Sequence, residues 1–217
     1  MGGLAIVRRI LNRIACNCAA LPRAGGTEFE HALGEKALAE SRVIGVLLLA
    51  LASAHSTAAS VSFDCAASGA AESPPTSSPG AGTVYAEIDA SANTMSIVAS
   101  FSGLVGTTTA AHIHCCTTTA GVGTAGVATQ VPNFNGFPLG VTAGSYTSPL
   151  FDLSSASSFN PAFITANGGT VAAAASAFEN GMDSGHAYFN IHTSVSPSGE
   201  IRCFLRSQRI FANGFDG

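Results

Sequence analysis

Two neighbouring segments alternate between apolar and more polar side chains, and this period limits the folds that the chain can adopt. The segments are "TVYAEID" (83–89) and "TMSIVASF" (94–101), and their apolar positions are Val84, Ala86 and Ile88, then Met95, Ile97, Ala99 and Phe101. Successive side chains of a β-strand point to opposite faces, so each segment presents one apolar face. The four residues between the two segments are a common length for the loop of a β-hairpin. The pattern predicts an antiparallel sheet that covers a core on one side.

The end of the chain carries two further strand patterns. They are "HAYFNIHT" (186–193) and "GEIRCFL" (199–205), joined by a turn that contains proline and glycine. Between the early and late strands, residues 171–180 form an alanine-rich run that predicts a helix, with Thr170 as N-cap and Gly181 closing it. We therefore expect a mainly β fold, an antiparallel β-sandwich of Greek-key or immunoglobulin-like type with one or two short inserted helices.

Composition changes divide the chain into four parts, of which the first is residues 1–59. Residues 60–82 include "ASGAAESPPTSSPGAG" and are expected to form a flexible linker. Residues 83–205 hold the strand patterns and are expected to form one domain, and residues 206–217 a C-terminal tail. A second short helical turn is expected at residues 161–166.

The basic residues lie almost entirely at the two ends of the chain. Of nine lysines and arginines, none lies between residues 43 and 201. From residue 60 onward three arginines face nine acidic residues. A surface with so few cations cannot neutralise phosphates, which excludes a nucleic-acid partner.

Residues 1–59 are expected to be an N-terminal extension and a signal peptide that is absent from the mature protein. Arg42 precedes a short apolar run, and small residues follow with a cleavage pattern at Ala52–Ala54 and another at Ser56–Ala58. The run is shorter than the roughly 20 residues that span a bilayer, so no transmembrane segment is expected in the mature chain. The predicted location is secreted or periplasmic. An even set of four cysteines then suggests disulfides, with three possible pairings.

Three histidines form the candidate site. His112 and His114 are two positions apart, so on a strand they share one face. Tyr188, Asn190 and His192 share a face in the same way. If the two strands approach each other, three imidazoles converge, which is a donor set for zinc or copper. Alternatively, the histidines are structural and donate hydrogen bonds to the backbone, to Asn190 or to Glu200.

The order of these segments resembles the CHRD domain family, which occurs in chordin and in many secreted bacterial proteins. The resemblance rests on "AHIH" (111–114) and on "AYFNIHTSVSPSGEIR" (187–202), whose motif residues are Asn190, Thr193, Gly199, Glu200 and Arg202. It implies an extracytoplasmic β-sandwich. Glu200 and Arg202 share a strand face, so they can pair with each other or with a histidine.

The chain departs from the family pattern after "GEIR". The family usually has glycine there and this chain has Cys203, which leads us to expect a disulfide with Cys65. Cys115 and Cys116 would then be left as a vicinal disulfide, as two thiols or as ligands.

The expected function is that of an exported, non-catalytic binding or structural module with an extracellular ligand or protein as partner. The sequence has no G-x-S-x-G nucleophile motif and no paired carboxylates at a readable spacing. The alternative is a copper or zinc protein with a site made by His112, His114 and His192, with a possible redox role.

Overall fold

All pairings between the named strands are antiparallel. The computed structural model describes residues 60–208; the expected N-terminal extension and signal peptide (1–59) and most of the expected tail (209–217) lie outside the described residues. The strands are β1 (Val61–Ser68), β2 (Ala81–Asp89), β3 (Thr94–Ser102), β4 (Thr108–His114), β5 (Gly144–Thr147), β6 (Phe151–Asp152), β7 (Tyr188–Thr193), β8 (Ile201–Phe204) and β9 (Arg206–Ser207).

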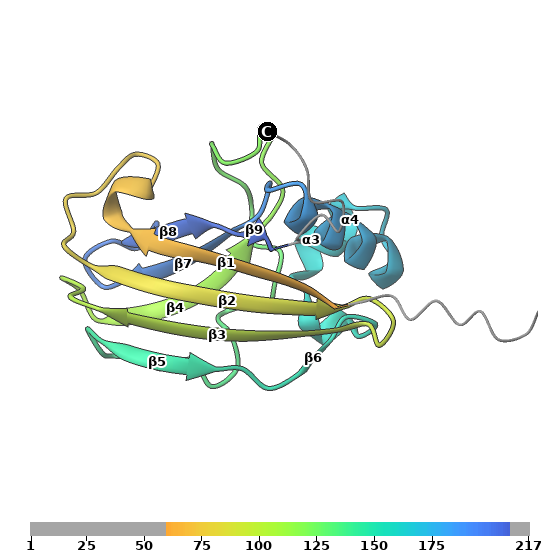
Figure 1. The fold of residues 1–217 in the computed structure, drawn as a ribbon, viewed down its shortest axis with the longest axis horizontal. Helices are drawn as coiled ribbons and strands as arrows, with labels where there is room; N and C mark the ends of the chain where they lie inside the picture. Colours follow the sequence, from red (N-terminus) through yellow and green to blue (C-terminus); the bar gives the residue numbers. More distant parts are fainter. Residues whose placement is uncertain (1–59, 209–217) are drawn as a thin grey trace, which may run out of the picture. The chain divides into compact units, whose positions relative to one another are not determined.

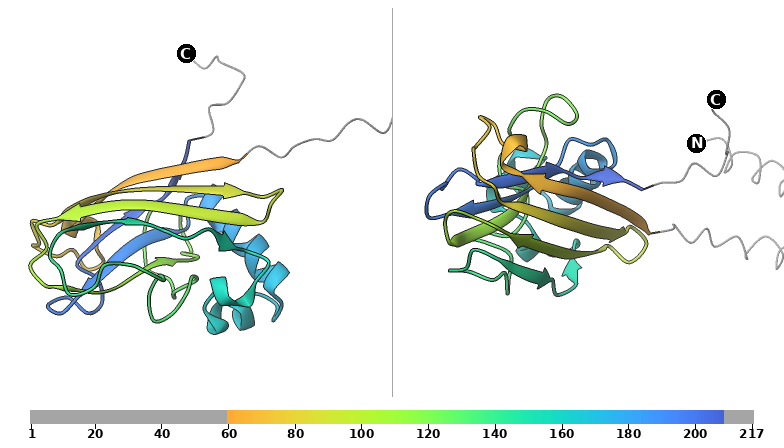
Figure 2. Two further views of the ribbon diagram at one scale, coloured as in Figure 1. Left: turned by 90° about the horizontal axis from the view of Figure 1, so that it is seen from below. Right: turned by 60° about the vertical axis from the view of Figure 1, so that its left-hand side comes forward.

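One curled sheet supplies both layers of the fold. Its strand order is β4-β7-β8-β1-β2-β3-β5, while β6 pairs with β3 and β9 pairs with β1. Strands β1, β2, β3 and β5 form one layer and β4, β7 and β8 the other, as the views in Figures 1 and 2 show. The two layers are joined where β1 pairs with β8 at Ser68 and Arg202 and, further along, with β9, which follows β8 in the chain. This arrangement confirms the mainly antiparallel, sandwich-like fold, with both layers belonging to one continuous sheet.

The predicted hairpin is formed by β2 and β3. The register runs from Ala81 opposite Ser102 to Asp89 opposite Thr94. The apolar positions of the period-two pattern are buried in both strands. Asp89 shapes the turn, because its Oδ1 accepts hydrogen bonds from the backbone N–H groups of Ser91 and Ala92 at 2.9 and 3.0 Å.

The prediction of a flexible linker is wrong for residues 61–68, because these residues form strand β1. This strand pairs with β2 along all eight of its residues, and Phe63 and Ala67 face the core. A short 3-10 helix, η2 (Gly69–Ala71), follows it. Val61, Phe63, Cys65 and Ala67 alternate with more polar or small residues, so β1 has a period of two. The pattern is weak because only Val61 and Phe63 are large, and a run rich in small residues follows directly. The expected tail also begins too early, because residues 206–207 form β9 beside Phe63 and Asp64.

Two α-helices lie together at one end of the sandwich (Figure 1). Helix α3 (Pro161–Ala166) matches the expected short turn, and a further 3-10 helix, η3 (Ala156–Ser158), precedes it. Helix α4 (Val171–Asp183) is capped by Thr170 as predicted. Gly181 does not close α4, which continues to Asp183. Among residues 60–208 no helix is long and apolar enough to cross a membrane.

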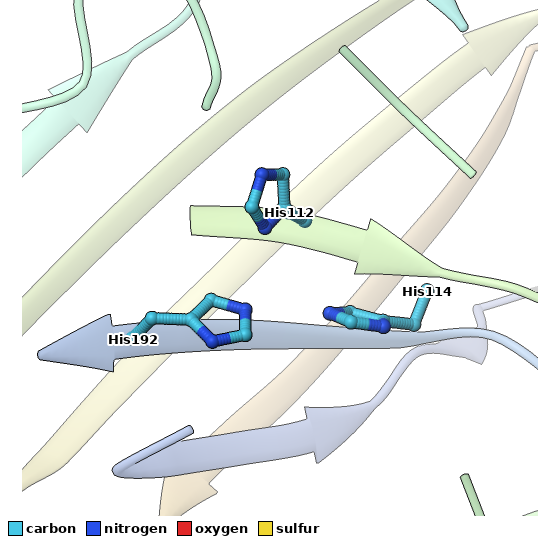
Figure 3. A group of neighbouring side chains, drawn as sticks. All are labelled: His112, His114 and His192. Carbon is cyan, nitrogen blue, oxygen red and sulfur yellow. The ribbon is translucent and has the colours of Figure 1, made fainter. Parts of the chain in front are cut away.

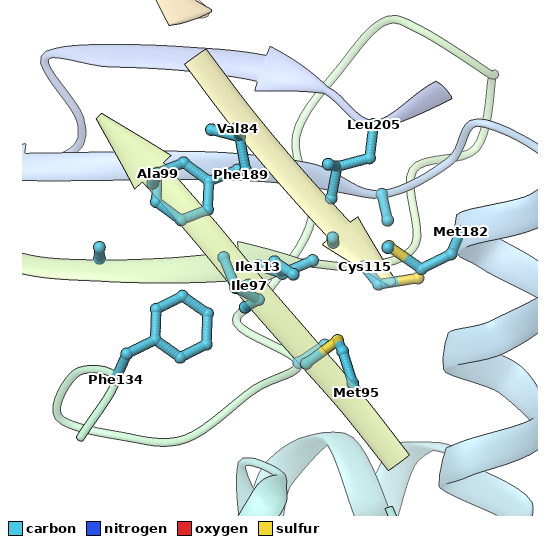
Figure 4. Close-up of a cluster of buried hydrophobic side chains, with 14 of the residues drawn as sticks. Val84, Met95, Ile97, Ala99, Ile113, Cys115, Phe134, Met182, Phe189 and Leu205 are labelled. Carbon is cyan, nitrogen blue, oxygen red and sulfur yellow. The ribbon is translucent and has the colours of Figure 1, made fainter. Parts of the chain in front are cut away.

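The core lies between the two layers and beneath the helices. Figure 4 shows Ile97 of β3, Ile113 of β4 and Phe189 of β7 gathered with Phe134 from a loop. Each of these side chains is at most 1% exposed. Burying such side chains is the main favourable contribution to folding, at about 1.5–3 kcal/mol for each one.

Gly181 of α4 lies against the vicinal cysteines. Cys115 and Cys116, which follow β4, are at disulfide distance from each other, with Cα atoms 3.0 Å apart. A Cβ atom added to Gly181 would overlap the Sγ atoms of both. Because glycine has no side chain, α4 can pack closely onto the two cysteines at the end of β4.

Cys65 of β1 and Cys203 of β8 are the second pair at disulfide distance. Their Cα atoms are 5.7 Å apart, and 138 positions separate them in the sequence. This pair links the first strand of the described fold to the late strand that carries the family motif. A crosslink that closes so long a loop stabilises mainly by restricting the unfolded chain.

Glu200 holds together three loops at the end of the sandwich opposite the helices. Its Oε1 accepts hydrogen bonds from Ser78 Oγ and Val105 N, both at 2.6 Å. Its Oε2 accepts from Thr193 Oγ1 at 2.6 Å and from Gly106 N at 3.0 Å. Burial raises the pKa of Glu200, but these four hydrogen bonds outweigh it and hold the pKa below its ordinary value of 4.5.

Replacing Gly181 with alanine should destabilise the fold. Alanine normally stabilises a helix interior by about 1 kcal/mol relative to glycine, whereas here its methyl group meets two sulfur atoms. We expect Gly181→Ala to lower the free energy of unfolding by about 1–3 kcal/mol, measured by denaturant titration. Ser176→Ala, at an exposed position of the same helix, is the control and should change it little. A more stable Gly181→Ala variant would contradict this packing.

Replacing Glu200 with glutamine should destabilise the fold at neutral pH and much less in acid. The amide NH2 cannot accept, so two of the four donors lose the oxygen that accepts from them, at a cost of about 2–4 kcal/mol at pH 7. Because the folded-state pKa is lowered, the contribution of Glu200 is present above pH 4.5 and is lost as the pH falls through the folded pKa. Denaturant titrations at pH 7 and at progressively lower pH should therefore converge for the two proteins.

The control for this series is Glu87→Gln on β2, where the carboxylate accepts one longer hydrogen bond, 3.3 Å from Tyr85 Oη. Its effect should be small at every pH. An equal loss of stability in the two glutamine variants, or a gap that stays constant with pH, would refute the role of Glu200.

Candidate metal centre

The pairing of β4 with β7 brings the three predicted histidines together. His112 lies opposite Asn190, His114 opposite Tyr188, and Ala110 opposite His192. All three histidines are on the face of this layer that points away from Ile113 and Phe189, which fill the core. Figure 3 shows the three rings side by side, two from β4 and one from β7.

The three rings form a nearly equilateral triangle. Their centroids are 5.9 Å apart for His112 and His114, 5.2 Å for His112 and His192, and 5.6 Å for His114 and His192. Each residue offers one ring nitrogen, and these nitrogens all lie within 4.8 Å of one another. Among the described residues this is the one group of His, Cys, Asp or Glu side chains with that geometry.

Backbone carbonyls fix which nitrogen of each ring carries the proton. His112 Nε2 is 2.7 Å from the Pro132 oxygen, His114 Nδ1 is 2.9 Å from the Ala125 oxygen, and His192 Nδ1 is 2.9 Å from the Pro197 oxygen. A carbonyl oxygen can only accept, so each of these nitrogens donates. This is the outer-shell arrangement that orients histidines in metal sites.

The remaining nitrogen of each ring is a lone-pair donor without a partner. His112 Nδ1, His114 Nε2 and His192 Nε2 are buried and make no hydrogen bond. Leaving a buried acceptor unsatisfied costs about 1–3 kcal/mol. Three such atoms in one small region fit a metal ion, which would accept all three lone pairs.

The imidazoles are neutral at neutral pH. Burial lowers the pKa of His112 and of His114 to about 4 in each case, against the opposing effect of their bonds to Pro132 and Ala125. Burial also lowers the pKa of His192, although its bond to Pro197 opposes this. Metal ions bind the neutral imidazole, so the site is in its ligating form without first losing protons.

The motif residues surround the histidines but do not belong to the triangle. Asn190 Nδ2 donates to Glu72 Oε1 at 2.6 Å, and Asn190 Oδ1 is buried without a partner. Gly199 has a φ of +131°, and an added Cβ would lie within 2.8 Å of both Asn190 and Glu72. Thr193 Oγ1 donates to Glu200, as described above.

Arg202 and Glu200 do not pair with each other or with a histidine. Arg202 Nε lies 3.8 Å from Glu72 Oε2, and both side chains are buried. The Arg202 guanidinium lies over the ring of Tyr188, 4.8 Å from its centroid. Tyr188 in turn stacks on His114, with the ring centroids 4.7 Å apart and the planes 6° from parallel.

Sequence reasoning missed Glu72 and gave Tyr188 no role. Glu72 follows η2, inside the segment that its composition assigns to a linker. Tyr188 was placed on the correct face, but stacking depends on ring orientation, which no spacing encodes. The four cysteines among residues 60–208 lie outside the histidine triangle.

Comparison with known proteins assigns a family to this architecture. The family model for the CHRD domain matches residues 63–205, from the third residue of β1 to just past the end of β8. No curated protein and no solved structure matches the chain. Because the match covers 143 of the 217 residues and includes both histidine motifs, the chain belongs to the CHRD domain family.

Proposed function

We propose that this protein is an exported CHRD-domain protein whose β-sandwich binds one copper or zinc ion through His112, His114 and His192. The observation that carries the proposal is the set of three buried ring nitrogens without hydrogen-bond partners in the triangle. A purely structural histidine needs partners for both of its nitrogens, or exposure to water, once it is buried. Here each ring has one nitrogen satisfied by a carbonyl and one left for a ligand.

The proposed role is binding rather than catalysis. Each imidazole N–H already donates to a backbone carbonyl, so none of the three rings is free to shuttle a proton while it holds a metal. The structural alternative, in which the histidines only support the sheet, is favoured by the location of all three on well-paired strands. The two alternatives differ in whether the protein takes up metal.

Export is supported by two independent features. Residues 43–52 form an apolar run after Arg42, with small residues beyond it. Cys65 and Cys203 lie at disulfide distance, and such pairs persist in oxidising compartments. Together these favour a secreted or periplasmic protein.

The mature protein should bind about one zinc or copper ion per chain, and His114→Ala should abolish this binding. Removing one of three ligands leaves two, which is too few for a closed protein site. The measurement is metal analysis of desalted protein after incubation with each metal. Binding should also stabilise the fold, by about 2.7 kcal/mol when free metal is 100 times the Kd.

The matched control is His186→Ala. His186 lies outside the triangle, and its Nδ1 is bonded to the Thr117 oxygen. This variant should retain the metal. A wild-type protein with no more metal than His114→Ala would refute the proposed function and favour the structural role of the histidines.

Export should be visible in the mass of the protein recovered from the periplasm or the culture medium. We expect an N-terminus that follows Ala54 or Ala58. Peptide mapping without reductant should join the peptides of Cys65 and Cys203. Retention of residues 1–54 on the protein in those fractions, or a link from Cys203 to Cys115 or Cys116, would contradict this part of the proposal.

A further inference from the structure

The donor set of the metal centre carries no charge. Its three ligands are neutral imidazoles, and no carboxylate or thiolate of residues 60–208 joins the group. His112 and His114 are 6% and 8% exposed. A cation that binds here brings its full charge into a poorly solvated place. The cost of burying an ion grows with the square of its charge, so a divalent ion is penalised far more than a monovalent one.

A buried guanidinium lies close to this neutral site. From residue 60 to residue 208 the chain has just two basic side chains, Arg202 and Arg206. Arg202 is 4% exposed. Its guanidinium lies over the ring of Tyr188, and the same ring stacks on His114. Its Nη1 donates to the Gly123 oxygen at 2.9 Å and its Nε to the Ala71 oxygen, which hold the guanidinium in place.

The guanidinium of Arg202 is close enough to the metal centre for its charge to matter. His114 stacks on one ring, that of Tyr188, and the guanidinium lies over the same ring, so the two charges would be separated by little more than one aromatic side chain in a buried region. The nearby carboxyl of Glu72 offsets this charge only in part, because burial raises the pKa of Glu72 to about 7 against the pull of Arg202 and Asn190. Part of the Arg202 charge therefore remains uncompensated, and it disfavours a doubly charged ion at the metal centre more than a singly charged one.

Building on the proposed function, we infer that the three-histidine centre selects copper in its +1 state over Zn²⁺ and Cu²⁺, and that the buried guanidinium of Arg202 strengthens this preference. Copper accepts imidazole ligands and is stable as a monovalent ion, whereas zinc is divalent only. Three neutral nitrogens in a nearly equilateral triangle suit a trigonal Cu⁺ ion. Zn²⁺ takes four ligands and would have to recruit another group or water at this site.

Competition between the two ions tests the inference on the wild-type protein. The exported protein is incubated without oxygen, in ascorbate, with one equivalent each of Cu⁺ and Zn²⁺, then desalted and analysed for metal. Ascorbate leaves disulfides intact, and His114→Ala reports any metal held elsewhere. We expect copper at the site with little zinc. Zinc that holds the site against Cu⁺ would overturn this inference and leave the proposed function standing, whereas failure to bind either ion would remove both.

Charge variants test the part played by Arg202. The Cu⁺ affinity is measured against bicinchoninate and the Zn²⁺ affinity against a pyridylazo chelator. Arg202→Gln removes the positive charge that lies one aromatic ring away from His114 and should shift the affinity ratio toward Zn²⁺ by about three- to tenfold. Arg206→Gln makes the same change at an exposed residue of β9 and should leave the ratio unchanged.

Arg202→Lys separates charge from packing. It keeps the positive charge but loses the planar stack on Tyr188, so it should keep the preference for Cu⁺. An affinity ratio that is the same in Arg202→Gln and wild type, or that changes equally in Arg202→Lys and Arg202→Gln, would overturn the role of the charge. If Arg202→Gln does not fold, the wild-type competition still decides between Cu⁺ and Zn²⁺.

Discussion

The register of β4 against β7 is the constraint on which the rest of the site depends. It places His112 opposite Asn190 and His114 opposite Tyr188, with His192 one step further along the same face. A shift by one residue would turn every one of these side chains into the core and bring Ile113 and Phe189 out of it. The apolar face thus enforces the position of the polar face, because the hydrophobic contribution of the core would be lost in any other register.

Around this register the protein builds a buried polar layer in which most groups have a defined partner. Glu200 is bonded to four donors, and Glu72 holds both Asn190 and Arg202. The exceptions are concentrated: the buried side-chain atoms without partners in the described residues are one nitrogen of each clustered histidine and Asn190 Oδ1. Three of these four atoms belong to the histidine triangle, and this clustering supports the proposed ligand site rather than a general defect in packing.

Much of the fold could be predicted because its strands display the period-two pattern. The alternation in β2 and β3 and the shared parity of His112, His114 and His192 are visible in the sequence, and they lead to the sheet and to the triangle. Strand β1 escaped prediction although Val61, Phe63, Cys65 and Ala67 alternate with smaller or polar residues, because only two of these four side chains are large and a run rich in small residues follows directly. Gly181 was read as a helix end since glycine commonly ends helices, whereas its actual role depends on two sulfur atoms from a distant segment. Glu72 could not be found because only tertiary pairing distinguishes it from a solvated residue of a loop.

The carbonyl groups that orient the histidines come from Ala125, Pro132 and Pro197, which lie in loops outside the named strands. A backbone oxygen is present whatever side chain the residue carries. The orientation of the ligands is therefore encoded in the path of these loops and not in their amino-acid identities. A substitution in these loops is therefore expected to disturb the rings only where it changes the path of the backbone, as the loss of Pro132 or Pro197 could, because proline restricts φ.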